Sequence, residues 1–123
     1  MANPIILYVD DEPDALKVIG LGLEGRGYTV VTCGNGNDAL ELLKTKIPDL
    51  ILADLRMEPM NGFDFFQAVK KMNTLQHTPF FFLTAVNDYL AQKYGQNLGV
   101  DAYITKPVDL DDLEAMIKNK LST

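Results

Sequence analysis

Three uninterrupted runs of apolar residues constrain the fold of this chain more than any other feature. They occupy residues 5–9, 50–53 and 79–83. Each run has the length of a strand rather than of a helix, and each ends at turn-forming or polar residues. An apolar run without alternation is typical of a strand buried on both faces, as in the centre of a parallel sheet. Helical patterns lie between the runs, so the sequence predicts an α/β protein.

Two further segments, residues 28–33 and 102–105, mix β-branched or aromatic residues with polar ones. This mixture predicts strands that are exposed along one side, at the edges of the sheet. With right-handed crossovers, the order 2-1-3-4-5 places the three apolar runs in the centre. The predicted fold class is therefore α/β, a flavodoxin-like doubly wound five-stranded parallel sheet with five helices.

Helices are expected where apolar residues recur at helical spacing. The first follows Pro13 and stops at Gly25, and the second is capped by Asn35 or Asn37. Two more are expected over about residues 63–72 and 88–98, and the last follows an N-cap at Asp109. The helix over 88–98 has sparse apolar positions and an internal glycine, so we expect it to be among the least stable elements.

The length and composition limit the class of protein. A chain of 123 residues that is 47% hydrophobic can bury one core without disulfides, which predicts a single domain over residues 1–123. A net charge of −6 argues against bulk binding to nucleic acid or to anionic membranes. No apolar stretch approaches the roughly 20 residues that span a bilayer. We therefore expect a cytoplasmic protein, in which the only cysteine, Cys33, is a buried and inert thiol.

Chemically active residues follow the ends of the predicted strands: Asp10, Asp11, Asp54, Thr84 and Lys106. The carboxyl ends of parallel strands meet at one edge of a sheet, so these side chains are expected to converge. Three carboxylates repel one another, each pair by about 4 kcal/mol at 4 Å and an effective dielectric constant near 20. One lysine and one divalent cation would neutralise them, and a site of oxygen ligands without His or Cys favours Mg²⁺ or Mn²⁺.

Such a site suits phosphoryl chemistry. A carboxylate can attack phosphorus to form an acyl phosphate, while a lysine and a metal ion stabilise the phosphoryl oxygens and a threonine hydroxyl binds one of them. A simpler alternative is that Asp10 and Asp11 only cap the first helix. The two glycines of residues 34–36 lack the spacing of a nucleotide-binding loop. We interpret His77 as a solvated loop residue at the opposite end of the sheet, and Phe80–Phe82 as core.

Four motifs carry a resemblance to a known family. They are Val9–Glu12, Asp54–Met57 with the following Asn61 and Gly62, Thr84-Ala85, and Tyr103–Pro107. In this order and spacing they resemble the receiver domain of two-component response regulators, over essentially the whole chain. The resemblance implies that Asp54 is the phosphoacceptor.

The resemblance also implies a metal site and a switch. Mg²⁺, with Mn²⁺ as the alternative ion, would bind Asp11, Asp54 and the backbone carbonyl of Arg56, and Asp10 would act partly through water. Thr84 and Lys106 would hold the phosphoryl group. Thr84 and Tyr103 would form the switch, although an ordinary edge-strand aromatic is the alternative for Tyr103. The Lys106–Pro107 bond is a candidate cis peptide.

Several positions depart from the family pattern. Glu58 stands where a proline often follows the methionine, with Pro59 one position later, and Val108 stands where phenylalanine often follows Lys-Pro. Arg56 and Val86, each two residues beyond Asp54 and Thr84, would border the attacking water and affect the lifetime of the phosphate.

The predicted function is a signalling switch in a two-component system or phosphorelay. A sensor histidine kinase or a histidine phosphotransfer protein would phosphorylate Asp54, and the surface of the helix over 88–98, the strand over 102–105 and the last helix would repack. The protein would be regulatory rather than an enzyme, with a downstream protein target or output domain, no direct nucleic-acid or membrane partner, and a homodimer as one response to phosphorylation.

Two rival functions are set aside on sequence grounds. A phosphatase of the haloacid dehalogenase type has a second aspartate two residues after the nucleophile, where this chain has Arg56, and carries a cap domain or insertion that 123 residues barely accommodate. A receiver-like module that works without phosphorylation usually lacks some site residues, and all five are present here. Whether the chain stands alone or belongs to a longer regulator stays open.

Overall fold

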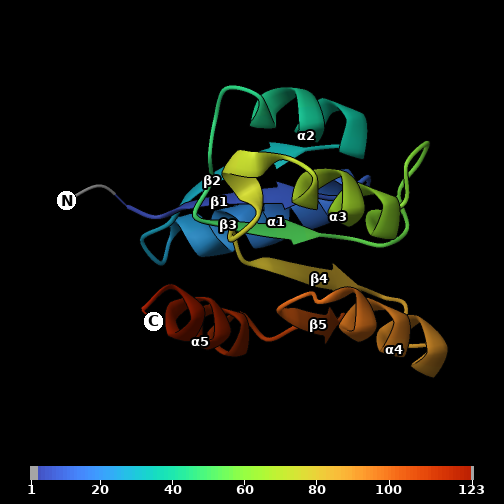
Figure 1. Ribbon diagram of the computed structural model, residues 1–123. Helices are drawn as coiled ribbons and strands as arrows, with labels where there is room; N and C mark the ends of the chain where they lie inside the picture. The colour runs from blue at the N-terminus through green and yellow to red at the C-terminus, as the bar shows by residue number, and fades with distance from the viewer. Residues whose placement is uncertain (1–2, 123) are drawn as a thin grey trace.

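Five parallel strands form one sheet in the computed structural model, which describes residues 3–122. Their bounds are β1 (Ile5–Val9), β2 (Thr29–Cys33), β3 (Leu50–Ala53), β4 (Phe80–Thr84) and β5 (Ala102–Thr105). The strand order is β2-β1-β3-β4-β5, so the predicted order is confirmed and the two mixed segments lie at the edges. Figure 1 shows the strands side by side with their helices around them.

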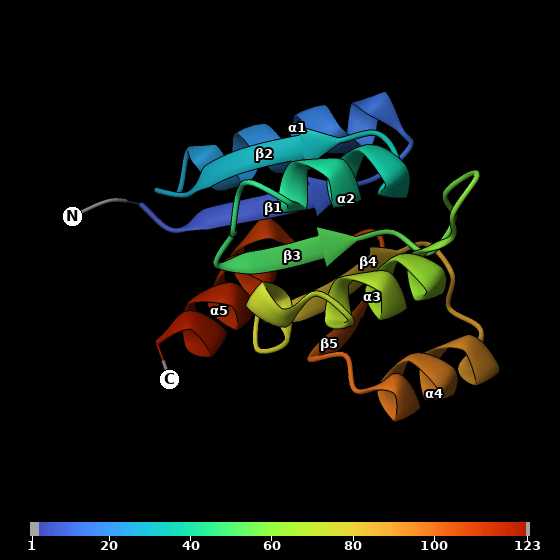
Figure 2. The same ribbon diagram turned by 45° about the horizontal axis from the view of Figure 1, so that its top comes forward.

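Helices cover both faces of this sheet. In the described part of the chain they are α1 (Pro13–Glu24), α2 (Gly36–Leu43), α3 (Gly62–Lys70), α4 (Tyr89–Leu98) and α5 (Leu110–Leu121), with a short 3-10 helix, η1 (Asn73–Leu75). Helices α1 and α5 lie on one face, and α2, α3 and α4 lie on the other (Figure 2). Within residues 3–122, no helix combines the length and the hydropathy needed to cross a membrane.

The alternation of side chains along the central strands divides the core into two layers. In β4, Phe80 and Phe82 face the helices α2 and α3, whereas Phe81 faces α1 and α5. All three rings are at most 2% exposed, which confirms the prediction that this run is core. Strands β1 and β3 alternate in the same way, so the three apolar runs supply both layers at once.

Side-chain caps begin four of the described helices, including α4, where Asp88 accepts the backbone N–H of Leu90 at 3.1 Å. Asn35, rather than Asn37, accepts the backbone N–H of Asp38 at 2.8 Å, and Asn61 accepts that of Asp64 at 2.9 Å. The predicted cap at Asp109 is confirmed, because its carboxylate accepts the backbone N–H of Asp111 at 2.7 Å. These bonds satisfy N–H groups that have no partner within their own helix.

The structure corrects the prediction for Cys33, which is half-buried rather than buried because β2 is an edge strand. Burial, followed by the charge of Asp38, raises the pKa of its thiol. His77 is exposed in the loop before β4, as expected. Helix α3 ends at Lys70, two residues earlier than the sequence suggested.

Helix α4 makes a lighter contact with the sheet than its neighbours. Gly95 is its only buried residue, and Leu90 is 72% exposed. A Cβ atom on Gly95 would lie 3.3 Å from the ring of Tyr103, so the glycine allows the helix to approach β5. The lower stability expected for this helix stays a prediction.

Candidate functional site

The ends of β1 and β3 bring two aspartates side by side. Val9, the last residue of β1, pairs with Ala53, the last residue of β3. Asp10 directly follows Val9, and Asp54 directly follows Ala53. The backbone N–H of Asp54 donates to the carbonyl of Val9 at 3.0 Å. Both aspartates are buried, with exposed fractions of 0% and 3%. A pair of buried carboxylates is unfavourable without compensating positive charge.

Lys106 supplies part of that charge from the end of β5. Its Nζ atom lies 2.7 Å from Oδ2 of Asp10 and 3.4 Å from Oδ2 of Asp54. Burial alone would lower the pKa of Lys106, but the hydrogen bond and charge of Asp10, with a smaller effect of Asp54, raise it above its ordinary value. The lysine therefore stays protonated between the two carboxylates.

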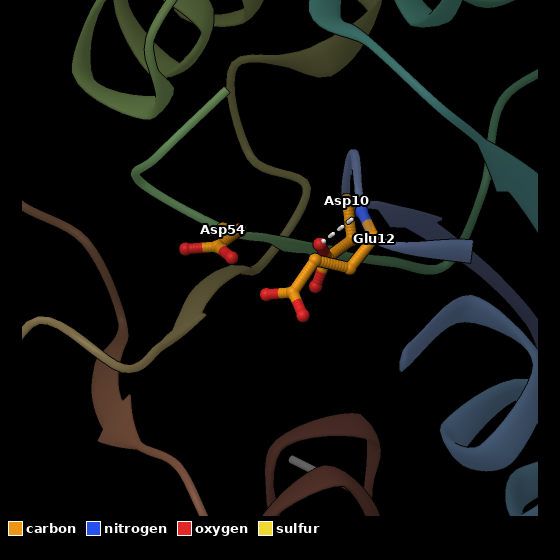
Figure 3. A group of neighbouring side chains, drawn as sticks. All are labelled: Asp10, Glu12 and Asp54. Atoms are coloured by element: carbon orange, nitrogen blue, oxygen red, sulfur yellow. Dashed lines mark hydrogen bonds between the residues drawn. The ribbon is translucent and has the colours of Figure 1, made fainter. Parts of the chain in front are cut away.

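A third carboxylate completes an acidic group at this edge. Asp10, Glu12 and Asp54 each offer an oxygen, and these atoms lie within 4.8 Å of one another (Figure 3). The backbone N–H of Glu12 donates to Oδ1 of Asp10 at 3.0 Å, which turns the chain back toward the site. Sequence reasoning missed Glu12, although it stands in the same acidic run. Asp11, the expected ligand, lies outside this group, and both Asp11 and Glu12 are exposed.

The donor set fits a hard divalent cation. Three carboxylates and one lysine give −3 + 1 = −2, and every donor in the acidic group is an oxygen. Mg²⁺ and Mn²⁺ prefer such ligands, and Mg²⁺ keeps several waters. Arg56, whose carbonyl is a predicted ligand, donates its backbone N–H to Oδ1 of Asp54 at 3.2 Å, so its peptide borders the carboxylate. Its role as a ligand stays a prediction.

The loop after β3 is held close to the site by Gly62. The backbone N–H of Gly62 donates to the carbonyl of Leu55 at 2.9 Å, and a Cβ atom at this glycine would collide with the backbone carbonyl of Asp54. Only a glycine permits this approach of α3. The loop contains a cis peptide bond at Glu58–Pro59, and the predicted cis bond at Lys106–Pro107 is confirmed.

Thr84 and Tyr103 meet at a single residue, Val86. The hydroxyl of Thr84 accepts the backbone N–H of Val86 at 3.2 Å, and the hydroxyl of Tyr103 donates to the carbonyl of Val86 at 2.6 Å. Thr84 is fully buried at the end of β4, and its carbonyl accepts the backbone N–H of Lys106 at 2.8 Å. The loop after β4 therefore connects the two predicted switch residues directly.

Tyr8 is a contact of the site that sequence reasoning missed. Its hydroxyl donates to Oδ2 of Asp10 at 2.8 Å, from a side chain that is fully buried. Burial, followed by the hydrogen bond with Asp10, raises its pKa far above the usual value, so it stays protonated. The available signal was spacing, because residues two apart on a strand share a face of the sheet.

Comparison with known proteins shows which family this chain is similar to. Residues 6–118 match the family model of the response regulator receiver domain. The chain is 37% identical over 116 residues to the transcriptional regulatory protein GlrR of Escherichia coli, covering 94% of this chain and 26% of that protein. It is 35% identical over 124 residues to the response regulator Rre1 of Synechocystis, covering 99% of this chain and 54% of Rre1. The chain thus spans about a quarter to a half of these relatives.

A solved structure shares both the fold and part of the sequence. The crystal structure of a putative response regulator from Chloroflexus aurantiacus has a TM-score of 0.92 and 27% identity, covering 98% of this chain and 99% of that one. The family match, these relatives and the acidic group beside Lys106 agree with one another. The chain belongs to the receiver domain family of response regulators.

Proposed function

We propose that this chain is a phosphorylation-dependent switch in which Asp54 accepts a phosphoryl group from a histidine kinase or a histidine phosphotransfer protein. One observation carries the proposal: Lys106 lies 2.7 Å from the buried Asp10 and 3.4 Å from the buried Asp54, and these two aspartates with the exposed Glu12 keep a surplus of negative charge. A site that only stabilised the fold would gain nothing from such a surplus.

The chemical step follows from these contacts. A carboxylate oxygen of Asp54 forms a bond to phosphorus, and the P–N bond of the phosphohistidine breaks. The electron pair of that bond stays on the imidazole nitrogen, and the partner retains a neutral histidine. The Nζ of Lys106 is within reach of the Asp54 carboxylate and would stabilise the phosphoryl oxygens, and the hydroxyl of Thr84 would bind one of them.

The acidic group is the proposed metal site. Asp54 and Asp10, with Glu12 beside them, would hold Mg²⁺ or Mn²⁺ together with the carbonyl of Arg56. Asp11, which precedes Glu12, stays a proposed ligand by resemblance to the family. When bound, the cation neutralises charge on the phosphoryl oxygens and orients the transferring group.

The two hydrogen bonds of Val86 would transmit a change at Thr84 to Tyr103. A phosphoryl group on Asp54 adds a charge of roughly −1.5 to −2. If the hydroxyl of Thr84 turns toward it, the hydroxyl leaves the N–H of Val86, whose carbonyl holds Tyr103. Because the ring of Tyr103 also faces Gly95 of α4, where an added Cβ atom would lie 3.3 Å from it, the change would spread to the surface of α4, β5 and α5.

The remaining proposals follow from family membership. The whole chain, residues 1–123, would form one receiver domain that acts in the cytoplasm as a regulator rather than as an enzyme. A kinase or phosphotransfer protein would be its phosphodonor, and a downstream protein or output domain would read the altered surface, with dimerisation as one outcome.

Intact-mass spectrometry with acetyl phosphate tests the chemistry. The unmodified protein should gain one phosphoryl group in the presence of Mg²⁺ and none after chelation, and Asp54→Asn should gain none. Asp64→Asn, which changes an exposed carboxylate in α3, is the matched control and should behave like the unmodified protein. Uptake by Asp54→Asn at the control rate would exclude Asp54 as the acceptor, and continuous turnover of a simple phosphate ester would favour the phosphatase.

A further inference from the structure

The Asp10 carboxylate holds more hydrogen bonds than the proposed phosphoacceptor beside it. Its Oδ2 atom accepts both the hydroxyl of Tyr8 at 2.8 Å and the Nζ of Lys106 at 2.7 Å. Its Oδ1 atom accepts the backbone N–H of Glu12 at 3.0 Å. Asp10 is 0% exposed, so protein donors replace the water that a carboxylate otherwise needs.

The proposed function requires Lys106 to serve a second group. Its Nζ atom is closer to Asp10 than to Asp54, at 2.7 Å against 3.4 Å. If the lysine turns to a phosphoryl group on Asp54, Oδ2 of Asp10 loses its charged donor. A buried carboxylate oxygen left without a partner is strongly unfavourable, and that penalty would hold the lysine back.

We propose that Tyr8 is a positioning residue that keeps Oδ2 of Asp10 hydrogen-bonded when Lys106 turns to the phosphoryl group. This inference rests on the proposed function and deepens it. Tyr8 acts through Asp10 and Lys106 and does not touch the reacting atoms.

The surroundings of Tyr8 suit this role. The ring is packed in the layer between β1 and the helices α1 and α5, with Ile19 and Leu83 in the same buried cluster. A phenol in such packing has few rotamers, so its hydroxyl stays fixed while the lysine, on a flexible stem, moves. One oxygen of Asp10 thus has one mobile donor and one fixed donor.

Removal of the single hydroxyl tests the proposal. In Tyr8→Phe, the maximal rate of phosphorylation by acetyl phosphate at saturating Mg²⁺ should fall about tenfold, the factor for a hydrogen bond to a charged group at the low end of its range. The acetyl phosphate concentration that gives half the maximal rate should not change, because Tyr8 does not touch the donor.

Tyr28→Phe is the matched control. It removes a phenol hydroxyl from the same buried cluster, at a residue that is 8% exposed and does not contact Asp10. Its maximal rate should stay within about twofold of the unmodified protein. Equal rates in the two variants would overturn the proposal. If the unmodified protein takes up no phosphate, the proposed function itself is wrong, and the two failures are thereby distinguished.

A measurement on the unmodified protein covers the case in which Tyr8→Phe does not fold. Proton and ¹⁵N NMR spectra are compared before and after addition of Mg²⁺ and beryllofluoride, a phosphoryl mimic. The ¹⁵Nζ resonance of Lys106 should shift, while the hydroxyl proton of Tyr8 stays protected from exchange with water. Loss of that protection on addition of the mimic would show that Tyr8 leaves Asp10, and would contradict the proposal.

Discussion

Two lysines at opposite ends of the sheet are held in opposite ways. Lys106, after β5, lies between the carboxylates of Asp10 and Asp54. Lys70, at the end of α3, donates to three backbone carbonyls and lies 5.8 Å from the centre of the Phe66 ring. The carbonyls belong to Leu75, Gln76 and Thr78, at 3.2, 3.4 and 2.6 Å.

Their pKa values shift in opposite directions for this reason. Burial lowers the pKa of Lys70, and the charge of Asp101 offsets this only in part. Burial also disfavours protonation of Lys106, but the bond to Asp10 outweighs it and raises the pKa. The neutral carbonyls that tie Lys70 into a loop leave its single positive charge uncompensated, whereas the three carboxylates near Lys106 exceed its charge and leave a surplus of negative charge. We therefore expect the partners of a lysine, rather than its burial, to distinguish a structural role from a chemical one.

The largest expected difference between the two lysines is in their effect on the rate of phosphorylation. Lys106→Met should lower the rate with acetyl phosphate and Mg²⁺ by about 100-fold, the usual effect of removing one donor that stabilises transition-state charge. Lys70→Met should stay within about twofold, because it lies at the other end of the sheet. Intact-mass spectrometry over time measures both rates. A comparable loss in both variants would mean that the comparison reflects folding rather than chemistry.

The stability of the fold, unlike the rate of phosphorylation, should depend on Lys70. Lys70→Met should lower the free energy of unfolding by about 2 kcal/mol, because three carbonyls lose a charged donor. Urea denaturation followed by circular dichroism measures the change. Lys71→Met, at the exposed neighbouring residue, is the control and should change it by less than about 0.5 kcal/mol. An equal, small effect of the two variants would show that the three carbonyl contacts contribute little.

A smaller effect tests the surplus charge around Lys106. Asp54→Asn should raise the free energy of unfolding by about 1 kcal/mol, since relief of repulsion with Asp10 and Glu12 exceeds the lost attraction to Lys106. The same substitution should remove most of the stabilisation that added Mg²⁺ gives by mass action. Urea denaturation with and without Mg²⁺ checks both. A less stable variant that still responds fully to Mg²⁺ would argue against a metal site here.

The smallest effect is the pH dependence. As the pH rises through the lowered folded-state pKa of Lys70 toward its ordinary value of 10.5, the unfolded chain binds more protons, so the contribution of Lys70 to stability grows. The contribution of Lys106 is fully present below 10.5 and falls as the pH rises further, through its raised folded-state pKa. Urea denaturation at alkaline pH measures how far each methionine variant differs from the unmodified protein in its free energy of unfolding. With rising pH this loss of stability should grow for Lys70→Met and shrink for Lys106→Met, and parallel changes would contradict the opposite pKa shifts.

The sequence by itself determined the fold and the edge of the sheet that carries the site. The apolar runs and the mixed edge segments are local patterns, and together with right-handed crossovers they were sufficient for the strand order. Because strand ends in a parallel sheet share one edge, the meeting of Asp10, Asp54 and Lys106 also followed from the order of the chain.

Only the tertiary structure decided which side chains turn into that edge. It selected Glu12 over Asp11 for the acidic group, added the hydroxyl of Tyr8 to Asp10, and joined Thr84 to Tyr103 through Val86. Periodicity reports the face of an element on which a residue lies, and this information is local. Whether a side chain makes a particular hydrogen bond depends on the turn after each strand and on the rotamers that packing allows, even for residues two apart such as Tyr8 and Asp10, so it is fixed only when the chain is folded.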